Sequence, residues 1–483
     1  MNPYIVLVVI AVYFIVIYSI SYISSRKVDN AGFFVGNRQS SWYVVAFAMI
    51  SSSISGITFI SVPGMVAEKS FSYLQMNLGF VVGQFTIAFV LVPLFYRMNV
   101  VSIYEYLENR FGMSSYKTGA WFFFISKMLG ASVRLFLVCV VLQLLVFEPL
   151  HIHFIFNVIF TIGLVWLYTF QGGVKTLIWT DTLKSVCLIV SLLLCIYFLA
   201  SSLNYTPVTM VSSIFNHKYS QMFFFNDVND KRFFFKQFLA GVFVMIAMTG
   251  LDQDMMQRNL SCKNSKDSQK NMVISVISQF FIIVLFLMLG VLSYTFADLN
   301  GITVEKSDQL FPKIATGGYF PMIVGILFIV GLISAAYSAA GSALTALTTS
   351  FTIDILGATR KNGEAGVKRI RMATHVAMTV VMGIVILIFE ALNKTSVVDA
   401  VYILASYTYG PILGMFAFGI LNKSKIKDKY IPYIAIAAPI LCYILDKNSV
   451  EWFNGYQFSY ELLIMNASFV YIGMWFIKKR QSK

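Results

Sequence analysis

Long apolar runs separated by short polar segments dominate the chain and predict a bundle of membrane-spanning helices. About 18 apolar residues are enough for a helix to cross the hydrocarbon core of a bilayer. An odd number of such spans would place the two ends of the chain on opposite sides of the membrane. We expect thirteen spans, at residues 3–24, 42–66, 71–97, 115–147, 153–171, 175–202, 233–258, 270–298, 319–357, 371–392, 397–421, 429–446 and 457–479.

The basic residues indicate the orientation of the spans. Most of the 36 Lys and Arg residues lie in the loops after odd-numbered spans and in the C-terminal tail. The loops at 360–371 and 423–429 are examples. Cytoplasmic loops of membrane proteins are enriched in Lys and Arg. We therefore predict a multi-pass protein of the plasma (inner) membrane whose N-terminus is outside and whose C-terminus is cytoplasmic.

Composition agrees with a membrane protein and excludes other classes. The chain is 58% hydrophobic and 12% charged, whereas an ordinary soluble protein carries about 25% charged residues. The net charge of +14 reflects basic cytoplasmic loops, so we expect no nucleic-acid partner. The five cysteines lack metal-binding spacing. The sequence has no HExxH motif, P-loop or GxSxG elbow, so we expect no enzyme activity.

Polar residues inside the spans are the candidates for function, because apolar surface is the default in a bilayer. Glycine and proline among hydroxyls weaken the helical hydrogen-bond ladder, so that freed carbonyls can coordinate a cation and hydroxyls can face a ligand. Close helix packing by small residues is the alternative interpretation. The second span carries such a cluster, at Ser51, Ser52, Ser53, Ser55, Gly56, Thr58, Ser61, Pro63 and Gly64.

The ninth span presents a second cluster of small and hydroxyl residues. Ala335, Ser338 and Ser342 recur on one face of the predicted helix. Hard cations prefer oxygen ligands, and a packed helix can offer a carbonyl together with hydroxyls. Small-residue packing is again the alternative.

Two charged residues lie inside apolar spans, where an unpaired charge is costly. Asp181 in the sixth span can neutralise a bound cation, or it can pair with Lys184 three residues later. Arg134 lies near the centre of the fourth span, and its planar guanidinium group can bind a substrate carboxylate through two hydrogen bonds. A structural bond from Arg134 to carbonyls or to Asp181 is the alternative.

Six motifs, taken in order, resemble the sodium:solute symporter family, whose members include bacterial proline, galactose and sialic acid transporters. The resemblance covers nearly the whole chain. The motifs are FFVGNRQSSWYVVAFAMISSSISGITFISVPGMV (33–66), SIYEYLENRFG (102–112), GGVKTLIWTD (172–181), TGLDQDMMQRNLSCK (249–263), SAAYSAAGSALTALTTSFTIDIL (334–356) and YTYGPILGMFAFG (407–419).

The resemblance implies an all-α membrane protein of the leucine-transporter type, built from two inverted five-helix repeats. Each repeat would open with a broken helix, in the second and seventh spans, and Met248, Thr249 and Gly250 would lie in the second break. Solute and ion would bind between the repeats near the bilayer midplane. The implied divisions are an N-terminal helix and first cytoplasmic loop (1–41), the first repeat (42–202), an external loop (203–232), the second repeat (233–421), and two C-terminal helices with a basic tail (422–483).

The resemblance also implies a main sodium site. Its matched positions are Ser51 and Ile54 on the second span and Ala335 and Ser338 on the ninth. Ala339 falls where the family often has Ser or Thr, so one hydroxyl ligand is missing.

A second sodium site, present in some family members, matches Asp181, Ser338 and Ser342. Gly341 replaces a residue that is usually polar there. The departures at Ala339 and Gly341 leave weakened sodium coupling, a different stoichiometry, and proton or uncoupled transport as open alternatives.

For the solute, the resemblance to sialic acid transporters implies a ligand that bears a carboxylate. The gate positions of the sugar-transporting members fall on Met245 and Met248, which makes a neutral sugar the weaker fit, although Gln279 and Tyr402 can still donate hydrogen bonds. The implied solute-binding residues are Ser53, Ser55, Thr58, Asn77, Arg134 and Gln279.

We therefore expect a monomeric secondary active transporter in the lipid bilayer, which imports a small polar, sialic acid-like solute with Na⁺ by alternating access. One alternative is a sugar, amino-acid or monocarboxylate symporter with altered or absent sodium coupling. Another is a solute-sensing transceptor, which the lost hydroxyls at Ala339 and Gly341 favour. A channel is a third, although the central Arg134 suits cation conduction poorly.

Overall fold

The computed structural model describes residues 2–25, 30–54, 56–170, 173–304, 306–392 and 397–479. These residues form helices and connecting loops, and no strand is present among them. The α-helices are α1 (Pro3–Ser25), α2 (Asn30–Val35), α3 (Trp42–Ser53), α4 (Gly56–Gly64), α5 (Val66–Lys69), α6 (Tyr73–Thr86), α7 (Val92–Met98), α8 (Glu105–Arg110), α9 (Met113–Leu142), α10 (Phe154–Thr169), α11 (Gly173–Ser202), α12 (Pro207–Phe215), α13 (Phe234–Met245), α14 (Gln253–Asn259), α15 (Ser265–Asn300), α16 (Leu310–Thr316), α17 (Met322–Ser350), α18 (Ala358–Lys361), α19 (Glu364–Leu392), α20 (Val397–Thr408), α21 (Gly410–Leu421), α22 (Ile431–Lys447), α23 (Ser449–Trp452) and α24 (Leu462–Phe476). Short π-helical turns directly follow α6, α9, α13 and α17, at Ile87–Leu91, Gln143–Phe147, Ile246–Gly250 and Phe351–Ile355.

Every predicted span contains a helix. Within the described residues, 8 helices are long and apolar enough to cross a membrane, and the number rises to 11 when each bent pair of helices is taken as one span. The two other predicted spans hold α10 and α24, which are apolar but have only 16 and 15 residues. The positions of the predicted spans therefore agree with the helices, and length and composition mark 8 to 11 of the thirteen as able to cross a membrane.

The second and seventh spans are broken, as predicted. The helix axes of α3 and α4 differ by 56°, and the axis of α14 differs by 69° from that of the helix ending at Gly250. The second break lies at Leu251 and Asp252, so the placement of the break at Met248 to Gly250 was wrong by a few residues. The cause is the side chain of Asp252, which accepts hydrogen bonds from the backbone N–H groups of Asp254 and Met255 and so starts α14.

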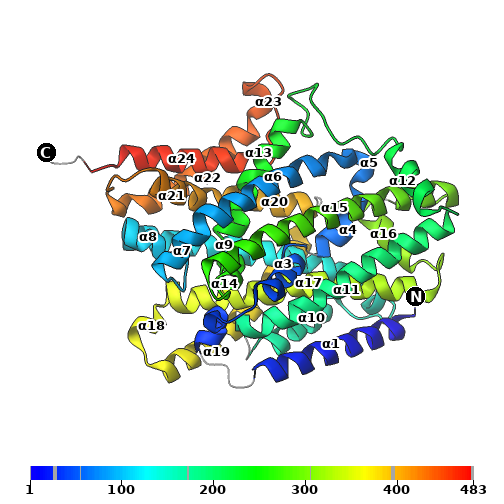
Figure 1. Ribbon diagram of the computed structural model, residues 1–483, viewed down its shortest axis with the longest axis horizontal. Helices are drawn as coiled ribbons and strands as arrows, with labels where there is room; N and C mark the ends of the chain where they lie inside the picture. Colours follow the sequence, from blue (N-terminus) through cyan, green and yellow to red (C-terminus); the bar gives the residue numbers. More distant parts are fainter. Residues whose placement is uncertain are drawn as a thin grey trace.

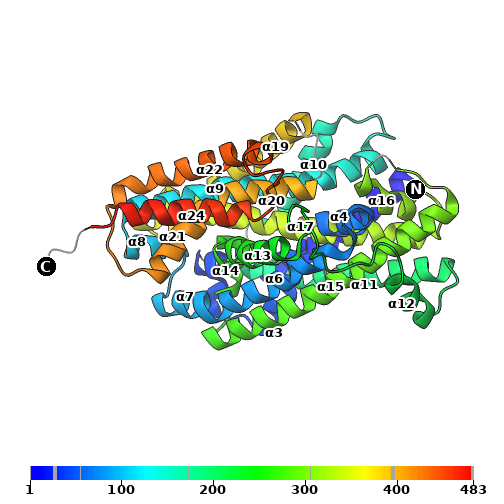
Figure 2. The same ribbon diagram turned by 90° about the horizontal axis from the view of Figure 1, so that it is seen from above.

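The helices form an elongated bundle, and the two described chain ends lie at opposite ends of its long axis (Figures 1 and 2). In its interior, α11 packs against α3 and α17, and α17 also packs against α9. On one edge α1 lies beside α10, and on the opposite edge α24 packs against α21 and α22 (Figure 1). The first broken helix, α3–α4, packs against α11, α15 and α17, whereas in the second α13 packs against α6 and α14 against α17.

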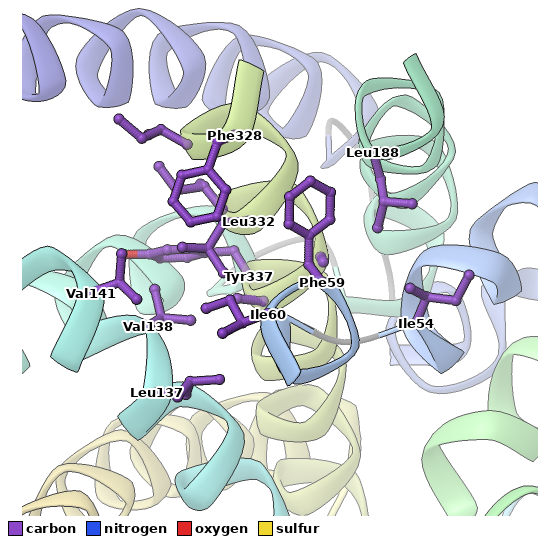
Figure 3. Packing of buried hydrophobic residues seen from close by; sticks show 14 of the residues in the cluster. Ile54, Phe59, Ile60, Leu137, Val138, Val141, Leu188, Phe328, Leu332 and Tyr337 are labelled. Carbon is purple, nitrogen blue, oxygen red and sulfur yellow. The ribbon is translucent and has the colours of Figure 1, made fainter. Parts of the chain in front are cut away.

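Apolar side chains fix α4 after the first break. The ring of Phe59 on α4 is fully buried and lies 5.9 Å from the ring of Phe328 on α17, measured between centroids. Figure 3 shows Phe59 facing Phe328 and Leu332 of α17, with Val138 of α9 nearby. This packing fixes α4 at an angle to α3.

The close approach of α6 and α13 depends on two glycines that face each other. A Cβ atom at Gly79 would collide with the carbonyl oxygen of Phe238, and one at Gly241 would collide with the carbonyl oxygen of Met76. We expect Gly241→Val to lower the free energy of unfolding by about 3 kcal/mol, because the backbones would have to separate. Thermal unfolding of the purified protein in detergent measures this loss.

Gly163 on α10 is the matched control, because a Cβ atom there meets no atom within 4 Å. Gly163→Ala is expected to leave stability unchanged or to raise it by up to about 1 kcal/mol, since alanine favours the helix over glycine. Equal destabilisation by both substitutions would contradict the packing argument.

Candidate functional site

A small cavity lies in the interior of the bundle beside the first break. Its volume is about 60 Å³. A second cavity of about 90 Å³ shares part of its wall and extends toward Lys127 and Asp252. The wall of the first cavity includes Ser53, Thr58, Tyr73, Arg134, Gln279 and Tyr402.

Four of the predicted solute-binding residues thus meet at one cavity, although α3, α4, α9 and α15 supply them. Asn77 is not in the wall of either cavity. It is buried on α6, and its side-chain amide donates a hydrogen bond to the carbonyl of Tyr73 one turn earlier, at 2.8 Å. Ser55 falls outside the described residues.

Arg134 is partly buried at the boundary between the two cavities. Among the described residues, no carboxylate pairs with its guanidinium and no carbonyl accepts a hydrogen bond from it. The alternative of a structural bond to Asp181 was wrong, because Asp181 pairs with other residues. An arginine inside a membrane protein is costly unless it faces a partner or a cavity, and here it faces a cavity.

The predicted ion-binding face brings α3, α11 and α17 together. The hydroxyl oxygens of Ser51 and Ser338 are 2.9 Å apart, and the Ser51 hydroxyl donates to the backbone carbonyl of Asp181 at 3.0 Å. Ile54 and Ala335, the other two residues matched to the main sodium site, are fully buried. The final carbonyls of a helix lack partners within that helix, and α3 ends directly before Ile54.

The carboxylate of Asp181 is engaged by two cations. Lys184 Nζ lies 3.2 Å from Asp181 Oδ1, and Arg258 Nη2 lies 2.9 Å from Asp181 Oδ2. All three side chains are almost completely buried. The structure thus places Asp181 in ion pairs, including the predicted one with Lys184. The hydroxyl of Ser342 donates to Asp254 Oδ2 at 3.0 Å.

These pairs belong to a continuous row of alternating charges, which we call the charge relay. From Arg258 it passes to Asp254, at 3.6 Å, and from there to Lys127, whose ammonium lies 2.7 Å from Asp254 and 3.0 Å from Asp252. The Tyr409 hydroxyl donates to Asp252 at 2.5 Å. The members of the charge relay, in order, are Lys184, Asp181, Arg258, Asp254, Lys127 and Asp252.

Sequence reasoning did not assign a role to four members of the charge relay. Lys127 lies inside an apolar span, and Asp252, Asp254 and Arg258 lie within the seventh span and its flank. Charged residues in spans are expected to pair with one another. These four residues are two cations and two carboxylates, and this balance was the available signal for pairing.

The model of the sodium:solute symporter family matches residues 33–427, which is most of the chain. The chain belongs to the sodium:solute symporter family. It is 23% identical over 453 residues to the sodium/sialic acid symporter NanT of Aliivibrio fischeri, covering 87% of this chain and 83% of the relative. It is 26% identical to sodium-coupled monocarboxylate transporter 2 of Danio rerio, covering 82% of this chain but only 64% of that relative.

The fold of this symporter-family protein agrees with that of solved transporters. A substrate-bound, outward-open structure of a Na⁺-coupled sialic acid symporter superposes with a TM-score of 0.83 at 16% identity, covering 97% of this chain and 96% of that one. The architecture is therefore that of an all-α membrane protein of the leucine-transporter type. The family and these relatives are sodium-coupled transporters of small solutes and not enzymes.

A larger vestibule lies beyond the cavity of this symporter-family protein. Its volume is about 860 Å³, and Tyr73 lines both spaces. The hydroxyl of Tyr73 lies 3.0 Å from that of Tyr402, so this pair of tyrosines stands between the vestibule and the cavity. On the vestibule wall, Arg232 donates hydrogen bonds to Asp230 and holds the pKa of that carboxyl below its usual range.

Proposed function

We propose that this protein imports a small polar solute bearing a carboxylate, resembling sialic acid, and couples its movement to Na⁺ by alternating access. The observation that carries the proposal is the unpaired guanidinium of Arg134 in the interior cavity. Lys127, the other cation in the walls of the two cavities, already pairs with Asp252 and Asp254. Arg134 is therefore the position at which an anion entering the cavity would gain the most binding free energy.

The chemistry around Arg134 suits an anion that also carries hydroxyl or amide groups. A guanidinium offers two parallel donors to one carboxylate. Ser53, Thr58 and Gln279 on the same wall supply hydroxyl and amide groups for the rest of the solute. Asn77 and Ser55 remain part of the proposed solute site on the strength of the family resemblance alone.

For the coupling ion, we assign the main sodium site to Ser51, Ile54, Ala335 and Ser338. A sodium ion there would join the end of α3 to α17, and so would order Ser53 and the first break for the solute. Such coupling is reciprocal: the solute must raise sodium affinity by the factor by which sodium raises solute affinity. The alanine at 339 leaves this site with fewer hydroxyls than the family pattern.

The proposal also covers the repeats, the orientation and the oligomeric state of the protein. We assign the inverted repeats to 42–202 and 233–421, between the extra segment 1–41 and the C-terminal segment 422–483. The N-terminus lies outside, with the 203–232 loop, and the C-terminus is cytoplasmic. We assign the transporting unit as a monomer.

A small monocarboxylate is the second candidate solute. The size of the cavity favours it, because about 60 Å³ accommodates a short acid more readily than a nine-carbon sugar acid. The similarity to the monocarboxylate transporter of Danio rerio also supports this candidate.

Uptake into proteoliposomes tests the proposal. Labelled sialic acid and labelled pyruvate are offered separately under an inward sodium gradient, an equal potassium gradient or a proton gradient, with protein-free liposomes as control. We expect sodium-driven accumulation of sialic acid. Accumulation of pyruvate alone would select the second candidate, and failure of both acids under every gradient would overturn the carboxylate proposal.

A further inference from the structure

The charge relay is electrically balanced without any ion from solution. It contains three carboxylates and three cationic side chains, and the exposed fraction of each side chain is 7% or less. Each neighbouring pair has opposite signs, and every carboxylate has a cationic neighbour. Side chains of the protein therefore already balance the negative charge of Asp181.

Lys184 ends the charge relay at the ion-binding face. Its ammonium contacts Asp181, whose backbone carbonyl accepts a hydrogen bond from Ser51, and Ser51 contacts Ser338. Asp181 and Ser338 are two of the positions matched to the second sodium site. The ammonium thus lies where a sodium ion bound to Asp181 would compete for the same carboxylate.

The surroundings of Lys184 are shaped for an ammonium. The aromatic ring of Tyr168 on α10 lies 4.2 Å from Lys184 Nζ, which gives the cation a π face in a fully buried position. The hydroxyl of Tyr168 donates to the carbonyl of Tyr337, and this bond fixes the ring.

Gly341 makes room for Tyr168. A Cβ atom at position 341 would overlap the Tyr168 hydroxyl oxygen, and the next nearest atoms also belong to the Tyr168 ring. The polar side chain that the family pattern has at this position is therefore incompatible with Tyr168 as it is placed here. The glycine at 341 and the lysine at 184 belong to the same local arrangement.

We propose that Lys184 takes the place of the second sodium ion, so that Asp181 binds no sodium and the transporter uses one sodium ion fewer than a relative with two ion sites. The inference deepens the proposed function and rests on it for the main sodium site. An ammonium tethered to the chain cannot leave with the solute as a sodium ion does, so Asp181 keeps this partner during transport.

Sodium binding to the purified full-length protein tests this inference without any solute. Equilibrium dialysis against radioactive sodium in detergent gives the number of ions bound per chain. We expect Lys184→Gln to bind one sodium ion more than the wild type, because the variant leaves Asp181 without its ammonium. We expect the double variant Lys184→Gln with Asp181→Asn to return to the wild-type number.

Equal sodium binding by the wild type and Lys184→Gln would overturn the inference. The double variant decides the question independently if the single variant does not fold, because its two side chains are neutral and close in size to the originals. Loss of a sodium ion in the double variant would show that Asp181 is a sodium ligand in the wild type and would also overturn the inference. If the proposed function is wrong, sodium-driven uptake will be absent. If this inference is wrong, the variants and the wild type will not differ in bound sodium as expected.

Discussion

Replacing Arg134 by alanine is expected to reduce carboxylate uptake by about 10- to 150-fold. Hydrogen bonds to a charged group contribute about 1.5–3 kcal/mol, and about 1.4 kcal/mol corresponds to a tenfold change in affinity. Arg134 is the unpaired cation in the cavity wall, so its loss removes that whole contribution. Arg134→Lys keeps the charge but not the planar fork, and it should impair uptake less than Arg134→Ala.

Initial rates of uptake over a range of solute concentrations measure this effect. Arg360→Ala is the matched control, because Arg360 is exposed, pairs with Glu108 and does not line the cavity. Uptake by the control should stay near the wild-type rate. Equal uptake by the wild type, Arg134→Ala and Arg134→Lys would exclude a role for Arg134 in solute binding.

Arg258→Met is expected to lower the free energy of unfolding by about 3–5 kcal/mol, which is typical when one partner of a buried ion pair is removed. Arg258 is the central cation of the charge relay and contacts both Asp181 and Asp254. Its exposed fraction is only 1%. The substitution leaves these carboxylates with one cation fewer in a dry environment, and thermal unfolding in detergent measures the resulting loss.

Arg360→Met provides the comparison at the surface. The side chain of Arg360 is 49% exposed, although its ion pair with Glu108 is bidentate. Exposed pairs contribute about 0–1 kcal/mol, so this variant should unfold close to the wild-type temperature. Similar destabilisation by the two methionine variants would mean that burial does not govern the energetics of the charge relay.

The course of the helices could be predicted from the sequence because a bilayer imposes a simple requirement. Each crossing needs a long apolar segment, and the polar clusters at Ser51–Ser53 and at Ser338 and Ser342 stand out against that background. The grouping of Ser53, Thr58, Arg134 and Gln279 was also anticipated, although only through the resemblance to a family and not from spacing along the chain.

The partner of Asp181 could not be decided from the sequence. Two candidates were evident for it, an ion and Lys184, but Arg258 lies 77 residues further along the chain, on α14 of the second broken helix. The role of Gly341 was likewise hidden, because the side chain that occupies the space beside it comes from Tyr168 on α10. Contacts of this kind depend on which helix faces meet, and the period of apolar residues does not specify that.

The balanced signs of the charge relay have a consequence for the response to membrane potential. Moving one unbalanced elementary charge across the bilayer changes the energy by about 2.3 kcal/mol per 100 mV, but the six charges of the charge relay sum to zero. The electric field therefore exerts no net force on the charge relay when its helices move together. We therefore expect the voltage dependence of the transport rate to come from charges outside the charge relay, such as Arg134 and the charges of the cargo.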